Sequence, residues 1–345
     1  VVDDTPANLK LLTEMLNARG YNARPVPNGR RALQAAKHDP PDLILLDINM
    51  PDMDGFEVCD VLKKDKDLQG IPVLFISAVE ETTEKVRAFD AGGVDFISKP
   101  FQFDEVNARV ETHLKLRSFQ LHLEELVEEK IKELSASQMS TIFALAKLAE
   151  SRDDETGKHI ERVRLYAKIM VDELKNHHRF KRFIDAQFIE NIYHATPLHD
   201  IGKVGIRDDI LLKPGKLTDE EFETMKSHTI LGAETLEFVR AQYPNNNFIN
   251  MGIAIARSHH ESWDGSGYPD GLSGDDIPLS ARIMTIADEY DALRSARPYK
   301  QTYSHEQCVE IIMAQKGIHF DPDIADTFFR IQDLFREVDA TFRDD

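Results

Sequence analysis

The second half of this 345-residue chain gathers side chains that bind metal ions. Imidazole and carboxylate ligands without thiolates suit transition metals such as Fe, Mn, Ni or Zn. The candidates are Glu155, His159, His199, Asp200, His228, His259, His260 and Asp288. They exceed what one tetrahedral ion needs, so they predict two or three ions, with Asp200 able to bridge through its two oxygens. Two metals about 3.5–4 Å apart are well suited to phosphodiester hydrolysis.

A second set of polar residues follows short apolar runs in the first hundred residues. Asp3 and Asp4 follow the expected end of a first strand, and Asp47 ends the next apolar run. Carboxyl ends of neighbouring parallel strands share one crevice, and converging carboxylates there favour a hard cation such as Mg²⁺. Ser77 and Lys99 end two further strands and supply a hydroxyl and a cation. Such a set is equipped to accept a phosphoryl group.

The elements that position this second set follow the pattern of a doubly wound α/β domain. Over the first ~110 residues, short apolar runs alternate with amphipathic stretches. Residues 43–46 and 73–76 are continuously apolar, which predicts buried parallel strands, and residues 96–97 predict a shorter last strand. Helix-spaced apolar residues predict helices over 6–19 and 55–64.

The pattern changes between about residues 105 and 150. Apolar residues recur every three or four positions among Glu and Lys, which predicts a long helix with a coiled-coil-like seam. The seam consists of Leu116, Phe119, Leu123, Val127, Ile131 and Leu134. It favours contact with a second copy of the chain, and the alternative is a single amphipathic helix packed on its own domain. From about residue 140 onward the pattern is mainly helical, except for a Gly- and Pro-rich insert at 263–278.

Composition excludes several classes of protein. With 42 Lys and Arg against 61 Asp and Glu, the net charge of −19 opposes binding along a nucleic acid, so we expect no DNA partner. Small anionic ligands stay open, because a local metal or basic pocket can overrule the global sign. No apolar run approaches the roughly 18 residues of a membrane span, so we expect no membrane partner. Two distant cysteines, Cys59 and Cys308, predict a cytoplasmic location. Because the chain starts at Val1 without Met, we expect residues upstream of it.

Four N-terminal motifs together resemble the receiver domain of two-component response regulators. They are Asp3-Asp4, the stretch 46–55, Ser77-Ala78 and Lys99-Pro100-Phe101. The resemblance covers residues 1–113 and implies a flavodoxin-like fold, a histidine kinase as partner and a cis peptide bond before Pro100. The alternative is that these acidic residues only cap strand ends.

The receiver resemblance also implies roles for single residues. It makes Asp47 the phosphoacceptor and Lys99 the phosphoryl contact, with Ser77 and Phe96 as the switch pair. The implied Mg²⁺ ligands are Asp3 through water, Asp4, Asp47 and the Asn49 carbonyl.

Three C-terminal motifs resemble the HD-GYP subfamily of HD phosphohydrolases. They are His199-Asp200-Ile201-Gly202-Lys203, His259-His260-Glu261 and Gly267-Tyr268-Pro269. The resemblance runs over residues 145–330 and implies cleavage of the bacterial messenger cyclic di-GMP to linear pGpG, with GMP as an optional second product. It makes all eight candidate ligands metal ligands, and a third metal depends on Glu155.

The HD-GYP resemblance further implies catalytic and substrate-binding residues. The catalytic residues would be His199, Asp200 and Lys203, and the substrate contacts would be Tyr268, Arg297 and Lys300. Cations suit an anionic ligand, and an aromatic ring in a Gly-rich loop suits a base. For Tyr268 the alternative is a loop residue packed on the core.

Together the patterns predict a response regulator with a receiver at 1–113, a helical linker at 114–144 and an all-α HD-GYP domain at 145–345. Phosphorylation of Asp47 is expected to control the phosphodiesterase through the linker, with a sign that the sequence does not give. Two alternatives stay open: a phosphohydrolase that prefers linear pGpG, and a non-catalytic receptor for cyclic di-GMP.

Overall fold

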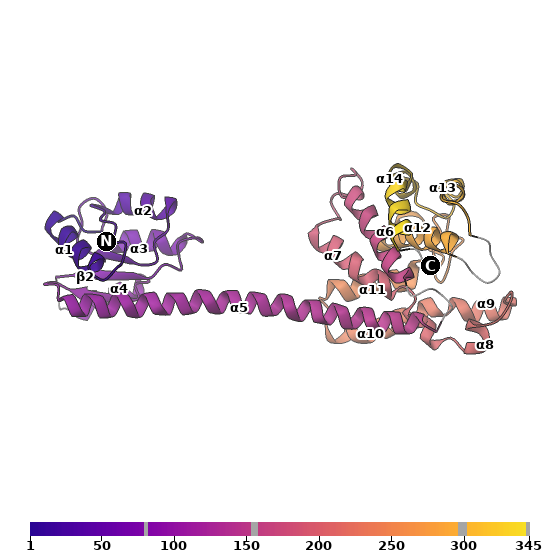
Figure 1. Cartoon of the computed structure of the whole chain (residues 1–345), viewed down its shortest axis with the longest axis horizontal. Helices are drawn as coiled ribbons and strands as arrows, with labels where there is room; N and C mark the ends of the chain where they lie inside the picture. Colours follow the sequence, from indigo (N-terminus) through magenta and orange to yellow (C-terminus); the bar gives the residue numbers. More distant parts are fainter. Residues whose placement is uncertain (79–81, 153–157, 296–301, 343–345) are drawn as a thin grey trace. The chain divides into compact units, whose positions relative to one another are not determined.

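The computed structural model describes residues 1–78, 82–152, 158–295 and 302–342. The chain forms two compact units, Val1–Glu133 and Leu134–Asp345, called the first and the second unit below. The first unit is a parallel sheet with helices on both faces, and the second is almost entirely helical, as the sequence predicted (Figure 1). Among the described helices, none has a stretch long and apolar enough to cross a membrane.

The sheet of the first unit is parallel throughout. Its strands, in spatial order, are β1 (Ile44–Asp47), β2 (Val73–Ser77) and β3 (Asp95–Ser98). Val2 extends the sheet beyond β1 through bridges to Leu46 on one side and Val26 on the other. The N-terminal segment therefore lies between β1 and the segment at Val26, which is the order of a flavodoxin-like doubly wound sheet.

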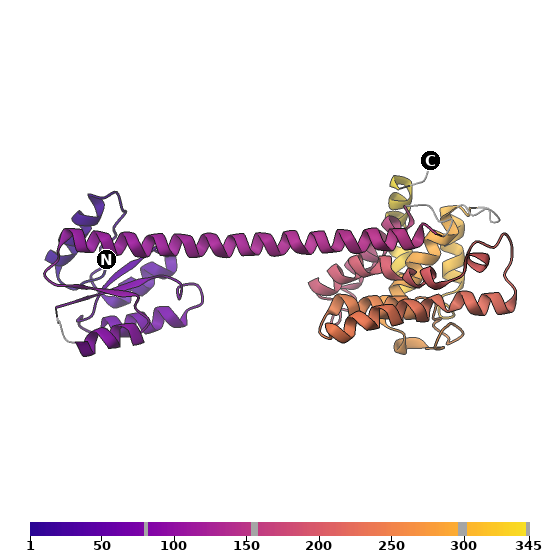
Figure 2. The same cartoon turned by 90° about the horizontal axis from the view of Figure 1, so that it is seen from below.

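Helices cover both faces of this sheet, so β1 and β2 are buried on both sides, whereas the edge strand β3 is half-buried. The helices are α1 (Pro6–Asn17), α2 (Gly29–His38), α3 (Gly55–Lys64), α4 (Thr82–Asp90) and α5 (Phe103–Glu150). Leu74 and Ile76 of β2 pack with α1 and α5, whereas Val73 and Phe75 pack with α2, α3 and α4. Figure 2 shows α5 along one side of the sheet. This two-sided burial explains the continuously apolar runs at 44–46 and 73–76.

The long helix α5 carries the predicted seam on an uncovered face. It is continuous from Phe103 to Glu150, and its residues from Leu134 onward belong to the second unit. The six apolar seam residues are between 49% and 72% exposed. No other side chain among the described residues covers this seam.

The second unit is a helical domain with one large core. Its helices are α6 (His159–Leu174), α7 (Ala186–Ala195), α8 (Asp208–Leu211), α9 (Asp219–Lys226), α10 (His228–Gln242), α11 (Asn247–Ser258), α12 (Leu279–Arg294), α13 (His305–Ala314) and α14 (Pro322–Thr341). Short 3₁₀ turns occur at η1 (Thr196–Leu198), η2 (Ile201–Gly205) and η3 (Gly274–Asp276). Helix α6 packs against α7, α12 and α14 (Figure 1). At their centre Tyr166 stacks on Phe335, with 4.5 Å between ring centroids.

Candidate functional site

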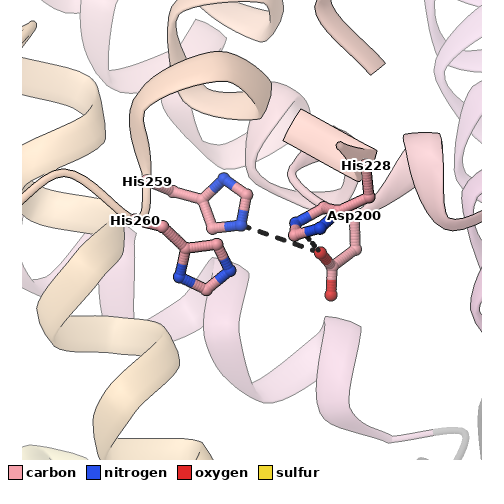
Figure 3. Close-up of side chains that lie close together, drawn as sticks. All are labelled: Asp200, His228, His259 and His260. Carbon is pink, nitrogen blue, oxygen red and sulfur yellow. Dashed lines mark ion pairs between the residues drawn. The ribbon is translucent and has the colours of Figure 1, made fainter. Parts of the chain in front are cut away.

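The carboxylate of Asp200 faces two groups of histidines with its two oxygens. Its Oδ1 lies 3.2 Å from Nε2 of His228 and 3.7 Å from Nε2 of His259 (Figure 3). Its Oδ2 lies 3.3 Å from Nε2 of His199 and 2.8 Å from Nζ of Lys203. One carboxylate therefore presents an oxygen to each group, which is the geometry needed to bridge two cations.

The ligand atoms divide into two subsites. The first subsite is Asp200, His228, His259 and His260, and the second subsite is His159, His199 and Asp288. Within each subsite the ligand atoms lie within 4.8 Å of one another. In the second, Oδ1 of Asp288 is 3.7 Å from Nε2 of His159 and 3.8 Å from Nε2 of His199. The structure thus brings together seven of the eight predicted ligands.

Local helix geometry fixes which nitrogen of three of these histidines is available. Nδ1 of His199, His228 and His259 donates to a backbone carbonyl three or four residues earlier. The accepting carbonyls are those of Thr196 (3.0 Å), Met225 (2.8 Å) and Ile255 (2.9 Å). A carbonyl can only accept, so Nδ1 carries the hydrogen and Nε2 keeps its lone pair. These three buried Nε2 atoms make no hydrogen bond within the described residues, which fits a metal centre.

The ionisation states of the first subsite also suit a cation. Burial alone would raise the pKa of Asp200, but the cation of Lys203 holds it well below its usual range. Burial lowers the pKa of His259 and moves that of His260 well below its usual value. An ionised Asp200 beside the neutral imidazoles of His259 and His260 is the protonation pattern that metal binding requires.

A glycine allows the segment after Asp200 to approach α10. A Cβ on Gly202 would lie 1.9 Å from the carbonyl oxygen of His228 and 2.5 Å from the amide nitrogen of Gly232. Only glycine fits this contact between backbones. The contact holds Asp200 and His228 in the same subsite.

Tyr268 lies beside the first subsite. Its ring stacks on His260, with 4.8 Å between centroids and 28° between planes. The buried carboxylate of Glu261 accepts hydrogen bonds from the backbone of Asp270 (2.8 Å) and Leu272 (2.9 Å) and so fixes the loop that carries Tyr268. The ring is half-buried, and the histidine on which it stacks is a candidate ligand.

Three predicted site residues are not placed by the structure. Glu155, Arg297 and Lys300 lie outside the described residues. Helix α6 begins at His159.

The predicted acidic cluster of the first unit forms at the carboxyl ends of its strands. The ligand atoms of Asp3, Asp4 and Asp47 lie within 4.8 Å of one another. Nζ of Lys99 is 3.0 Å from Oδ2 of Asp3 and 2.9 Å from Oδ1 of Asp47. Burial raises the pKa of Asp47 against the opposing effect of Lys99.

The receiver resemblance also assigns Ser77, Phe96 and Asn49 to this site. Ser77 is buried at the end of β2, and Phe96 is half-buried in β3. Asn49 is exposed two residues after Asp47. The peptide bond between Lys99 and Pro100 is cis, as the receiver resemblance implies.

Two acidic residues that the sequence did not single out lie at the second subsite. The buried carboxylate of Asp291 accepts hydrogen bonds from Nδ1 of His159 and Nε of Arg162, both at 2.7 Å. Its position three residues after Asp288 on α12 is the one sequence signal, since it puts both on one helix face. Glu150 ends α5, and its Oε1 lies 3.6 Å from Nε2 of His159.

Comparison with protein families gives two matches. Residues 1–111 match the response regulator receiver domain, and residues 144–324, more than half of the chain, match an HD domain. HD domains bind divalent metals, in keeping with the two subsites.

Curated relatives share both parts of the chain. A Vibrio cholerae protein named probable cyclic di-GMP phosphodiesterase is 41% identical, covering 100% of this chain and 80% of its own. The cyclic di-GMP phosphodiesterase response regulator RpfG of Xanthomonas campestris is 38% identical over 84% of this chain and 75% of its own. A cyclic di-GMP phosphodiesterase of Thermotoga maritima is 32% identical over 98% and 91%. The chain therefore belongs to the family of response regulators in which a receiver domain is followed by an HD-type phosphohydrolase domain.

Proposed function

We propose that the second unit hydrolyses cyclic di-GMP to linear pGpG, with GMP as an optional second product, under the control of phosphorylation at Asp47. The observation that carries this proposal is the carboxylate of Asp200, which presents one oxygen to each of two His-rich subsites. The relatives named cyclic di-GMP phosphodiesterases support the choice of substrate. A pure receptor for the nucleotide has no need of such a paired site.

The proposed cofactors are two or three divalent ions of Fe, Mn, Ni or Zn, for which imidazoles and carboxylates are suitable ligands. The two subsites would hold one ion each, and Glu155 would serve a third. When bound, these ions supply the Lewis-acid charge that polarises a phosphodiester. In the receiver, Mg²⁺ would be held by Asp4, Asp47, the Asn49 carbonyl and, through water, Asp3.

The chain's own side chains supply the remaining functions. Nζ of Lys203 lies 2.8 Å from Oδ2 of Asp200, which puts a fixed cation beside the position of the reacting phosphate. Tyr268 provides an aromatic face for a guanine base. Arg297 and Lys300 are proposed to contact the second phosphate.

In the receiver, Asp47 is proposed as the phosphoacceptor and Lys99 as the contact to the phosphoryl oxygens. Ser77 and Phe96 are proposed as the pair that rearranges on phosphorylation. The ion pairs of Lys99 with Asp3 and Asp47 support this, because the same cation can move to a new anionic group. The donor of the phosphoryl group would be a histidine kinase.

We also propose the organisation of the whole molecule: receiver 1–113, helical linker 114–144 and HD-GYP domain 145–345. The exposed apolar seam on α5 supports a homodimer formed through this linker. The net charge of −19 supports the absence of DNA and membrane partners. The two buried free cysteines support a cytoplasmic location.

The substrate is tested by comparing initial rates with cyclic di-GMP and with pGpG at matched concentrations. A higher kcat/KM for cyclic di-GMP is expected. A clear preference for pGpG would replace the proposal with its first alternative, a phosphohydrolase of the linear dinucleotide.

A further inference from the structure

The last turn of α5 places a carboxylate at the metal centre. Glu150 ends α5, and its side chain is 6% exposed. Its Oε1 lies 3.6 Å from Nε2 of His159, and Oδ1 of Asp288 lies 3.7 Å from the same nitrogen. Glu150 and Asp288 therefore each place a carboxylate oxygen near Nε2 of His159, and Oδ1 of Asp288 also lies 3.8 Å from Nε2 of His199.

These distances are those of ligands around a cation rather than of hydrogen bonds. With metal–ligand bonds of about 2.0–2.2 Å, neighbouring ligand atoms lie roughly 3.0–3.6 Å apart. A hydrogen bond needs about 2.7–3.2 Å between nitrogen and oxygen. In addition, Nδ1 of His159 donates to Asp291, so in the neutral ring Nε2 is a lone-pair donor that has no hydrogen to give to Glu150.

We propose that Glu150 is a direct carboxylate ligand of the second subsite, beside His159, His199 and Asp288. The inference rests on the proposed metal centre but is independent of the choice of substrate. It gives this subsite two carboxylates and two imidazoles, a donor set typical of divalent first-row metals.

The same end of α5 also contacts the segment that follows Asp200. Arg152 donates hydrogen bonds to the carbonyl oxygens of Val204 (2.5 Å) and Ile206 (3.3 Å) and to the carboxylate of Asp208 (2.5 Å). The chain leaving α5 thus reaches η2, which carries Lys203, as well as the second subsite. With Glu150 as a ligand, the C-terminal end of α5, just beyond the proposed linker at 114–144, contributes to the metal centre.

The test is a count of bound metal in Glu150→Gln, which removes the charge but keeps the shape of the side chain. The matched control is Glu129→Gln, the same substitution at an exposed position of the same helix. Both variants and the unchanged protein are dialysed against a series of Mn²⁺ concentrations, and the metal per chain is measured by mass spectrometry. Electron paramagnetic resonance reports whether the bound ions are spin-coupled.

For Glu150→Gln we expect at least about tenfold weaker binding at one of two sites and a loss of the spin-coupled signal. Glu129→Gln should behave as the unchanged protein. Unaltered stoichiometry and affinity in Glu150→Gln would overturn the proposal. If circular dichroism shows that Glu150→Gln does not fold, the same metal titration is made with Glu150→Asp, which keeps the charge but shortens the side chain by one methylene. Weaker metal binding at one site in Glu150→Asp supports the proposal, and unchanged metal binding overturns it.

Metal counting also separates this inference from the proposed substrate. A protein that loses one metal in Glu150→Gln but never hydrolyses cyclic di-GMP would retain Glu150 as a ligand and reject the phosphodiesterase.

Discussion

Nδ1 of His159 donates a 2.7 Å hydrogen bond to the carboxylate of Asp291, 132 residues further along the chain. Both side chains are buried, and Arg162 donates to the same carboxylate from one helical turn beyond His159. Burial opposes ionisation of Asp291, but Arg162 and His159 lower its pKa to about 2. The carboxylate is therefore a pure acceptor, which keeps the hydrogen on Nδ1 and leaves Nε2 of His159 available to a metal.

Replacing Asp291 by Asn should weaken metal binding at the second subsite about 10- to 100-fold. It should also lower the free energy of unfolding of the metal-free protein by about 3 kcal/mol, because the buried ion pair between Arg162 and Asp291 is broken. Metal titration and urea denaturation measure the two effects. Asp172→Asn, on α6 with a side chain that is 44% exposed, is the control, with an expected loss below about 1 kcal/mol. Equal behaviour of the two variants would show that Asp291 does not position His159.

Gly202→Ala should disrupt the contact between η2 and α10. The added Cβ would lie 1.9 Å from the carbonyl oxygen of His228, so backbone must move, and we expect a loss of about 3 kcal/mol or more in the free energy of unfolding. Gly252→Ala is the control, because its Cβ meets only side-chain ends of Leu198 and Leu236, at 3.1 and 3.3 Å. That variant should stay within about 1 kcal/mol of the unchanged protein. If both alanine variants keep the free energy of unfolding of the unchanged protein, the close contact between η2 and α10 is contradicted.

Tyr268→Ala should raise the KM for cyclic di-GMP roughly tenfold, because stacking of a base on an aromatic ring contributes about 1–3 kcal/mol. Tyr268→Phe keeps the ring and should retain a KM close to that of the unchanged protein. Initial rates over a range of substrate concentrations give both values. An unchanged KM in the alanine variant would leave Tyr268 as a loop residue packed on His260.

Phosphorylation by a small phosphodonor such as acetyl phosphate should label the unchanged protein and Asp60→Asn, an exposed control on α3, but not Asp47→Asn. The control of activity is tested with a phosphoryl mimic such as beryllofluoride. Activity of the mimic-treated protein equal to that of Asp47→Ala would argue against regulation through the receiver.

The sequence predicts the buried strands and the amphipathic helices well because their apolar residues follow simple periods. It did not predict α2, whose buried face consists only of Gly29, Ala32 and Ala36. Small residues of this kind give almost no apolar signal, and the helix is identified by its packing on α3. Similarly, among the described side chains of α4, only Ala88 is fully buried.

Seven of the proposed metal ligands could be found from residue type and spacing, since so many His and Asp residues gather in one domain, some of them as adjacent pairs. Asp291 and Glu150 could not, because they meet His159 only through the packing of α12 and of the end of α5 against α6. A carboxylate that reaches its partner only through the packing of helices leaves no recognisable pattern among its neighbours in the sequence. The roles of Arg297, Lys300 and Glu155 stay predictions.

The measurement that tests the central claim most directly is chromatography of the products formed from cyclic di-GMP by anaerobically purified protein loaded with Fe or Mn. The unchanged protein should produce pGpG or GMP, and the double variant His199→Ala with Asp200→Ala should produce neither. Hydrolysis that survives in the double variant would contradict the assignment of the site. No product from fully loaded protein that binds the nucleotide would contradict the enzyme itself and favour the receptor.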